Sequence, residues 1–516
     1  MGGTRKQRRR SRKIKIDLAE YEVIVKATEE RSLSDKERKV LLDAHQILAH
    51  LIPFENDETA SAILDGDKGN QSAGGDKKPK PRKGSGRRPR SDFPNAKVVK
   101  VCHTKVQTGE LCKCGCGRIY PLNRPIHFRH FVGQAPIEVT LYELEQLRCN
   151  SCGALYTADL PAGVGPSSYD ESAVSTIACG KYGLGTPFYR QALHFATMGT
   201  PISVAVQWAV VAEGAEKLEP AHDHMVQIAA QAKVGIFDDT SMPILNFERE
   251  EGDERTGLHT TGIVCVHDDF QIALFITGRN HAGENRADLL KKRSPHLPGM
   301  IQMSDALSSN LAYISSEELI ALCLVHGRRN FVKIVDSFPE ECRHVIRSIA
   351  TVYHHDSLSK AEGHTPEERL AFHQEKSAPV MEDLKEWLDI QILERKVEPN
   401  SSLGKAIEYM RSHWEPLTLF LRVADAPLDS NAVERILKKV VLHRKNSLFF
   451  KTIRGARVGD IYMSLIKTCE LNKVNPPEYL TALQRNHQAV KANPGEWMPW
   501  TFRATLERIR GSTVAA

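Results

Sequence analysis

The sequence predicts a multidomain α/β protein whose core is a mixed sheet interrupted by a mainly helical insertion. At 516 residues the chain exceeds what one ordinary hydrophobic core holds. From position 231 onward, runs rich in β-branched and aromatic residues alternate with turn residues, as in "VGIFDDTSMPIL" and "TGIVCVHDDFQIALFITG". A charged region with helically spaced leucines, at about 340–425, then precedes the helix "NAVERILKKVVL". Strands followed by a long helical stretch are typical of an α/β core with an insertion.

Shifts in composition divide the chain into six segments. We expect a basic arm with a helical hairpin at 1–52, a disordered basic linker at 53–95, a small cysteine-containing module at 96–165, a helical region at 166–230, the α/β core with its insertion at 231–457 and a helical tail at 458–516. The linker is rich in Gly, Asp, Lys, Pro and Ser and lacks hydrophobic periodicity, so it cannot bury a core of its own.

Positive charge is concentrated in two short arms. The formal net charge is +6, yet residues 1–16 and residues 77–90 carry eight Lys or Arg each, without an acid, and the remainder sums to −10. Such arms are typical of a protein that meets a polyanion locally, although a solvated, solubilising tail is the alternative for either one. Four bases of the second arm are candidates for DNA contact: Lys80, Arg82, Arg87 and Arg88.

Neither secretion nor membrane insertion is expected. The chain has no apolar run of about 18 uncharged residues. The N-terminal stretch "MGGTRKQRRRSRKIKI" has the charge of a signal peptide but not its apolar centre. Eleven cysteines are an odd and modest number for this length, which favours free thiols and one metal site over a disulfide framework. We therefore expect a soluble cytoplasmic protein.

Five cysteines in two clusters predict one structural zinc site. "CKCGCG" supplies Cys112, Cys114 and Cys116, and "CNSCG" supplies Cys149 and Cys152. Zinc prefers thiolates, and the glycines let backbone N–H groups face the sulfur atoms. Four of these five thiols are expected to bind the ion. Reduced, uninvolved thiols are the alternative, but that alternative does not explain the paired clustering.

Three carboxylates are candidates for a magnesium site. Asp238 follows the apolar strand "VGIF", Asp305 follows "MIQMS", and Glu434 stands at the head of a basic helix. Oxygen ligands that converge on one or two magnesium ions are what phosphodiester chemistry requires. Structural roles are the alternative: the aspartates can bond the following turn, and Asn431 with Glu434 has the spacing of a capping box.

The helix that carries Glu434 places this single acid among bases. Glu434, Arg435 and Lys438 project from one face with Asn431, while apolar residues form the opposite face. A site that grips a metal-bound phosphodiester needs such a face. A solvated basic surface is the alternative.

The stretch "PLDSNAVERILKKVVLHRKNSLFF" strongly resembles the terminal catalytic motif of insertion-sequence transposases of the IS-sixty-six family. Three other segments are similar to family segments in the same order: "KYGLGTPFYRQ", "CLVHGRRNF" and "SLGKAIEYMRSHWEPLTLFL". Ser430, His443 and Ser447 depart from the usual Asn, Gly and Trp. The similarity covers roughly residues 80–483.

This resemblance implies an RNase H-like core with a DDE triad of Asp238, Asp305 and Glu434, which would hold two magnesium or manganese ions. Asp238 is preferred over Asp239 because the family's first acid lies in a D-x-T pattern, and Gln302 to Asp305 fits the family's Q-x-D segment with one extra residue. Six further residues are candidates for DNA contact: Arg435, Lys438, Arg444, Lys445, Arg328 and Trp414, with His326 beside the core as a supporting residue. A tryptophan in an apolar helix is more often part of the core.

The implied activity is DNA transposition. The zinc module, the 166–230 helices and the basic linker would bind the terminal inverted repeats, and the DDE domain would cleave the element ends and join them to target DNA. Expected partners are double-stranded DNA, a second copy in a dimer or larger synaptic complex, and small element-encoded accessory proteins, in the bacterial cytoplasm at the nucleoid. The alternatives are a catalytically inactive zinc-containing DNA-binding protein and a nuclease without strand transfer.

Overall fold

The computed structural model describes residues 109–110, 135–148, 155–161, 164–165, 167–248, 255, 257–307 and 318–514. The predicted basic arm, hairpin and linker lie outside the described residues. So do nine predicted site residues: Lys80, Arg82, Arg87, Arg88, Cys112, Cys114, Cys116, Cys149 and Cys152. Within the part of the chain that is described, no helix is both long enough and apolar enough to cross a bilayer.

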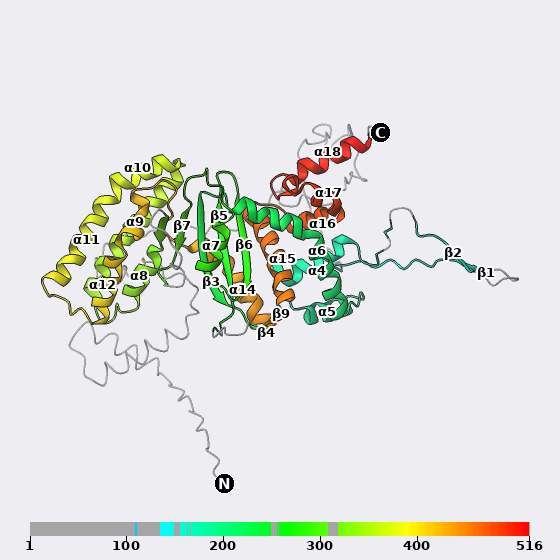
Figure 1. The fold of residues 1–516 in the computed structure, drawn as a ribbon, viewed down its shortest axis with the longest axis horizontal. Coiled ribbons are helices and arrows are strands. Elements are labelled where there is room, and N and C mark those ends of the chain that lie inside the picture. The colour runs from blue at the N-terminus through cyan, green and yellow to red at the C-terminus, as the bar shows by residue number, and fades with distance from the viewer. Residues whose placement is uncertain are drawn as a thin grey trace, which may run out of the picture. The chain divides into compact units, whose positions relative to one another are not determined.

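A five-stranded mixed sheet forms the centre of the fold, in the order β6-β5-β3-β7-β8 (Figure 1). Its strands are β3 Val234–Ser241, β5 His259–Val266, β6 Gln271–Gly278, β7 Ile301–Ser304 and β8 Leu319–Leu322. The first three pair antiparallel, whereas β7 runs parallel to both β3 and β8. Strands β5 and β6 are apolar and buried along most of their length, as in a sheet covered on both faces. The predicted mixed α/β class is confirmed.

Two small sheets accompany the central one. Strands β1 Gln146–Arg148 and β2 Leu155–Thr157 pair antiparallel. Strands β4 Ile244–Asn246 and β9 Phe450–Thr452 pair parallel, and they join the chain just after β3 to the chain just after the helix of Glu434.

Helices precede the sheet from residue 171 to residue 229. They are α4 Glu171–Ala178, the π-helix η3 Cys179–Gly183, α5 Phe188–Thr197 and α6 Val204–Ala229. Asp170 and Ser203 cap α4 and α6 by accepting backbone N–H groups of the first turn. The region predicted to be helical is therefore helical.

A group of helices stands between the last strand of the central sheet and the helix that carries Glu434. They are α8 Leu324–Val332, α9 Pro339–Glu362, α10 Pro366–Lys376, α11 Ala378–Leu393, α12 Ser402–Ser412, α13 Trp414–Leu417 and the 3₁₀ turn η4 Leu419–Leu421. Earlier in the chain, α7 Ala282–Leu290 follows β6. The long helical stretch predicted before the Glu434 helix is present.

Helix α14, Asn431–Ser447, packs on β3 and β5 and also against η3. Two of the family departures lie at the η3 contact. Ser447 accepts a hydrogen bond from Lys181 Nζ at 2.6 Å, and buried His443 lies between the rings of Tyr182 and Phe450. Burial, with the charge of Lys181, lowers the pKa of His443 to about 3, so its ring is a neutral part of the core.

Helix α15, Ile453–Leu471, runs beside the outer edge of β6 (Figure 1). Four side chains, spaced four residues apart, accept the N–H groups of alternate β6 residues: Asp460 from Thr277 at 2.8 Å, Ser464 from Phe275 at 2.9 Å, Thr468 from Ala273 at 3.0 Å and Asn472 from Gln271 at 3.1 Å. Four helical residues rise about 6.0 Å and two strand residues rise about 6.7 Å, so the two repeats match. The chain ends in α16 Pro476–Arg485, α17 His487–Ala492, η5 Pro494–Trp497 and α18 Phe502–Val514.

Candidate active site

Two of the predicted carboxylates lie at the ends of neighbouring parallel strands. Asp238 is in the second half of β3, and Asp305 directly follows β7. The register of this pair sets Val234 beside Ile301 and Ile236 beside Met303. Continued by two residues, the same register sets Asp238 beside Asp305 on one face of the sheet, because alternate residues of a strand share a face.

Helix α14 brings the third carboxylate to this face. Gly262 of β5, paired with Asp238, allows the close approach, since a Cβ there would lie 2.8 Å from a methyl group of Leu437. The helix begins at Asn431 after the N-cap Ser430, so Glu434 is the fourth helical residue and not the third. The side chain of Ser430 makes no capping hydrogen bond, and the N–H of Asn431 is accepted by Asp429 Oδ1 at 3.0 Å, not by Glu434. The capping-box alternative for Glu434 is therefore wrong.

The electrostatics of the cluster are those of partly buried carboxylates that repel one another. Burial, reinforced by the charges of Asp305 and Glu434, raises the pKa of Asp238 to about 7 against the lowering effect of a hydrogen bond from the Asp239 N–H. Glu434 Oε1 is buried and accepts no hydrogen bond from any residue that the structure describes. Repulsion between carboxylates and an unsatisfied acceptor are what a cation would relieve.

His326, on α8, lies beside the same cluster. Its Nε2 is 3.9 Å from Glu434 Oε1. Burial and then the neighbouring Arg329 lower the pKa of His326, and the carboxylates Glu434 and Asp305 oppose this shift. His326 Nε2 also accepts a hydrogen bond from Arg329 Nη1 at 3.3 Å, so in the neutral ring this nitrogen carries a lone pair and donates no hydrogen bond to Glu434.

The predicted DNA-contacting bases of α14 differ in their surroundings. Arg435, Lys438 and Lys445 are exposed. Arg444 is instead engaged at the end of β3, where its Nη1 donates to Thr240 Oγ1 at 3.1 Å and to the Oγ and carbonyl oxygen of the next residue. The geometry supports a positioning role for Arg444, because its guanidinium fixes the strand that carries Asp238.

Two other candidates for DNA contact lie among protein groups. Trp414 begins α13 with only 8% of its surface exposed. It therefore packs in the core and does not offer a ring face for the predicted stacking on a base. Arg328, on α8, is half-buried and contributes to the electrostatic surroundings of the Tyr353 phenol. Direct contact between Arg328 and DNA remains a prediction.

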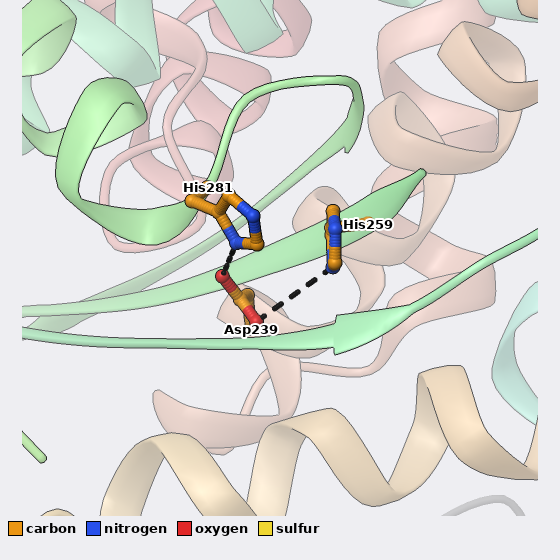
Figure 2. A group of neighbouring side chains, drawn as sticks. All are labelled: Asp239, His259 and His281. Carbon is orange, nitrogen blue, oxygen red and sulfur yellow. Dashed lines mark hydrogen bonds and ion pairs between the residues drawn. The ribbon is translucent and has the colours of Figure 1, made fainter. Parts of the chain in front are cut away.

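The opposite face of β3 holds a second polar cluster that the sequence did not reveal. Asp239 lies close to His259 of β5 and to His281, which precedes α7 (Figure 2). Neither histidine stands in a recognisable motif. Asp239 and His259 meet because of the β3–β5 register, which sets Asp239 beside Thr261 and Ser241 beside His259. Strand pairing between residues 20 positions apart cannot be read from the sequence.

The sheet and helix α14 thus bring three carboxylates from two strands and a helix to one face, next to exposed bases, and carboxylate oxygens are the ligands that hard divalent cations prefer. A family model for transposases, described as Transposase IS66 family, matches residues 166–458, which is more than half of the chain and includes the whole acidic cluster. The protein is thus of the transposase class. More narrowly, the chain belongs to the Transposase IS66 family.

Three uncharacterized proteins of Sinorhizobium fredii are similar to this chain. One, y4hP, is 27% identical over 385 residues, which cover 70% of this chain and 67% of its own length. A second, y4jD, is 27% identical over 409 residues, covering 76% of this chain and 78% of that protein. The third, y4qI, is 25% identical over 354 residues, covering 64% of this chain and 62% of that protein.

Proposed function

We propose that this protein is a DNA transposase that cleaves the ends of its insertion sequence and joins them to target DNA. The observation that carries the proposal is the convergence of Asp238, Asp305 and Glu434 on one face of the sheet, with an unsatisfied oxygen of Glu434 at the cluster. Membership in a transposase family supports the same reaction class.

An RNase H-like architecture is part of this proposal. The strand order β6-β5-β3-β7-β8, with three antiparallel strands followed by two parallel ones, supports it, as does an acid on the central strand. The helical insertion α9–α13 separates β8 from α14, so the third acid returns to the sheet from a distant part of the sequence.

Two magnesium or manganese ions are the proposed cofactors. The donor set fits them, because carboxylate oxygens are the ligands that these hard cations prefer. Asp238, Asp305 and Glu434 would hold the ions, which when bound activate the attacking oxygen and stabilise the leaving one. Cation binding also fits the raised pKa of Asp238, since the ionised form is unfavourable here without a positive charge.

The chain's own residues have distinct roles in the proposal. His326 lies beside Glu434, and Arg444 holds the end of β3 against the helix. Exposed Arg435, Lys438 and Lys445 contact phosphates that flank the cleaved bond. Water first attacks the phosphodiester at the element end, and the freed 3′ hydroxyl then attacks target DNA.

Recognition of the element ends is assigned to the residues before the sheet. The basic linker, a structural zinc held by four of the five clustered cysteines, and the 166–230 helices would bind the terminal inverted repeats. Two ends must be processed together, so a dimer or larger synaptic complex is proposed, with small element-encoded proteins as partners. The site of action is the cytoplasm, at the nucleoid.

The test incubates the full-length protein with duplex DNA that contains the element ends and magnesium, and resolves the products on denaturing gels. Glu434→Gln should lower nicking by at least roughly a thousandfold while it preserves DNA binding. The matched control Glu386→Gln, at an exposed position on α11, should nick like the wild type. If Glu434→Gln nicks as fast as the control, the proposed site is wrong.

The same gels separate the alternatives. Joined donor–target products are expected of a transposase, and nicks without joined products would instead indicate a nuclease. Binding without any nicking by the wild type would indicate a catalytically inactive DNA-binding protein.

A further inference from the structure

The cluster on the far face of β3 consists of one carboxylate and two imidazoles that point toward one another (Figure 2). His281 Nδ1 lies 2.9 Å from Asp239 Oδ2, and His259 Nδ1 lies 3.9 Å from Asp239 Oδ1. The two imidazole ring centroids are 4.0 Å apart. One ligand atom from each residue lies within 4.8 Å of the other two.

This cluster is separate from the acidic site. Asp239 and Asp238 are successive residues of β3, so their side chains leave opposite faces of the sheet. Asp238 faces α14, as its β5 partner Gly262 does, whereas Asp239 faces the start of α7 and accepts the N–H of Ala282 at 3.1 Å. No ligand is therefore shared between the two groups.

The surroundings hold the three side chains in place. The side chains of Asp239 and His259 are 14% and 17% exposed, and that of His281 is 35% exposed. The hydrogen bond from Ala282 fixes the carboxylate, and Glu284 Oε2 accepts the backbone N–H of His281 at 2.9 Å. Hydrogen bonds of this kind orient ligands around a metal.

The distances are close to those of a metal site. Ligand bonds of about 2.0–2.2 Å around zinc put neighbouring donor atoms about 3.3 Å apart. The two His–Asp separations, 2.9 Å to Oδ2 and 3.9 Å to Oδ1, lie on either side of that value but involve different oxygens, so a rotation of the carboxylate or of an imidazole is needed before all three donors meet one ion. Capping of α7 accounts for His281, which is the N-cap residue and forms a capping box with Glu284, and for the contact of Asp239 with the Ala282 N–H, but it does not explain why His259 lies against the same carboxylate.

We propose that Asp239, His259 and His281 bind one divalent transition-metal ion of the zinc class, distinct from the magnesium ions of the acidic site. Two imidazole nitrogens and one carboxylate oxygen suit zinc and its first-row neighbours, whereas magnesium prefers oxygen ligands. The His281 side chain is 35% exposed, so solvent reaches the edge of the cluster. Such an ion fastens α7 to β3 and β5, directly behind Asp238.

The test strips the full-length protein with a chelator and titrates it with cobalt and with zinc, while millimolar magnesium occupies the acidic site. Cobalt bound to cysteines shows charge-transfer absorption from sulfur. Cobalt bound to Asp239, His259 and His281 should show visible absorption bands but no sulfur charge-transfer absorption. We expect the wild type to bind one more equivalent of cobalt or zinc than His281→Gln and His259→Ala. In both variants the affinity of this site for the ion should fall at least a hundredfold. The matched control His296→Ala, at an exposed position after α7, should bind like the wild type.

Equal metal content and equal affinity in all four proteins would overturn the proposal. If the histidine variants do not fold, the wild type alone still decides, because a cobalt spectrum with no component free of sulfur absorption also overturns it. Glu434→Gln should retain the extra equivalent. Failure of the metal site is therefore distinguishable from failure of the proposed transposase activity.

Discussion

Replacing Asp238 with asparagine should stabilise the metal-free protein at alkaline pH. Burial, with the charges of Asp305 and Glu434, raises the pKa of Asp238 from its ordinary 3.8 to about 7. The folded state then holds a proton that the unfolded state has already lost between these two values, so stability falls as pH rises from about 4 to 7. About three pKa units at 1.36 kcal/mol each amount to about 4 kcal/mol of unfolding free energy.

Asparagine carries no charge at any pH, so it removes this loss. The unfolding free energy of the variant should exceed that of the wild type by about 4 kcal/mol at pH 8 but by only about 2 kcal/mol at pH 5. For a chain of this size, 4 kcal/mol corresponds to about 5 °C in the unfolding temperature. Thermal unfolding in the presence of a chelator, followed by circular dichroism at both pH values, measures the difference.

The comparison between two proteins cancels other groups that titrate in this range. Asp460 is one of them, because burial raises its pKa to about 7 as well. Asp383→Asn, at an exposed position on α11, serves as the control and should unfold within about 1 °C of the wild type. Saturating magnesium should narrow the gap at pH 8, since it stabilises only the wild-type site. A gap of equal size at pH 5 and pH 8, or no gap, would refute the reasoning.

Three further predictions concern the fold and the DNA surface. Gly185→Ala should lower the free energy of unfolding by about 2 kcal/mol, because φ is +71° and a Cβ would lie 2.9 Å from Leu442. The control Gly278→Ala, with open space around it, should lower the free energy of unfolding by less than about 1 kcal/mol. Urea unfolding of both variants measures the difference. Ser464→Ala leaves the N–H of a buried strand residue unsatisfied and should cost about 1–3 kcal/mol by the same measurement, whereas replacing a serine on the surface should cost much less. Lys445→Ala should weaken binding to all duplex sequences about equally and reduce the slope of log affinity against log salt by about 1, measured by fluorescence anisotropy. An unchanged slope would show that this lysine contacts no phosphate.

The elements that carry the candidate site were predictable from local patterns, whereas the choice of the three acids rested on the family resemblance. Asp238 and Asp305 each come at the end of an apolar run, and Glu434 lies on a helix whose apolar positions recur regularly. The central strands and the long helical insertion follow from the same periodicities. These features are encoded within windows of 10 to 20 residues, which sequence reasoning can read.

What the sequence left undetermined depends on contacts between distant segments. Arg444 looked like one more base of a DNA-binding face, but its guanidinium reaches the end of β3, 204 residues away in the chain. Trp414 could not be assigned to core or surface until its neighbours were known. The capping-box alternative placed the N-cap of α14 at Asn431, whereas the N-cap is Ser430. This shift by one residue makes Glu434 the fourth helical residue and not the third.

The cluster of Asp239, His259 and His281 shows the same limit. Its members come from two strands and the start of a helix, and nothing local marks either histidine. Preference for Asp238 over its neighbour rested on family resemblance, and the structure gives the two aspartates different surroundings on opposite faces.

The contact between α15 and β6 also bears on the order of synthesis. The strand residue Thr277 leaves the ribosome 183 residues before its partner Asp460. At usual rates of elongation, the outer N–H groups of β6 wait roughly 10 to 40 s for the helix that satisfies them. During that interval the nascent sheet has an open edge on which another chain can pair. Chains truncated before α15 are therefore expected to aggregate, and full-length chains made slowly are expected to need a chaperone until residue 472 has emerged.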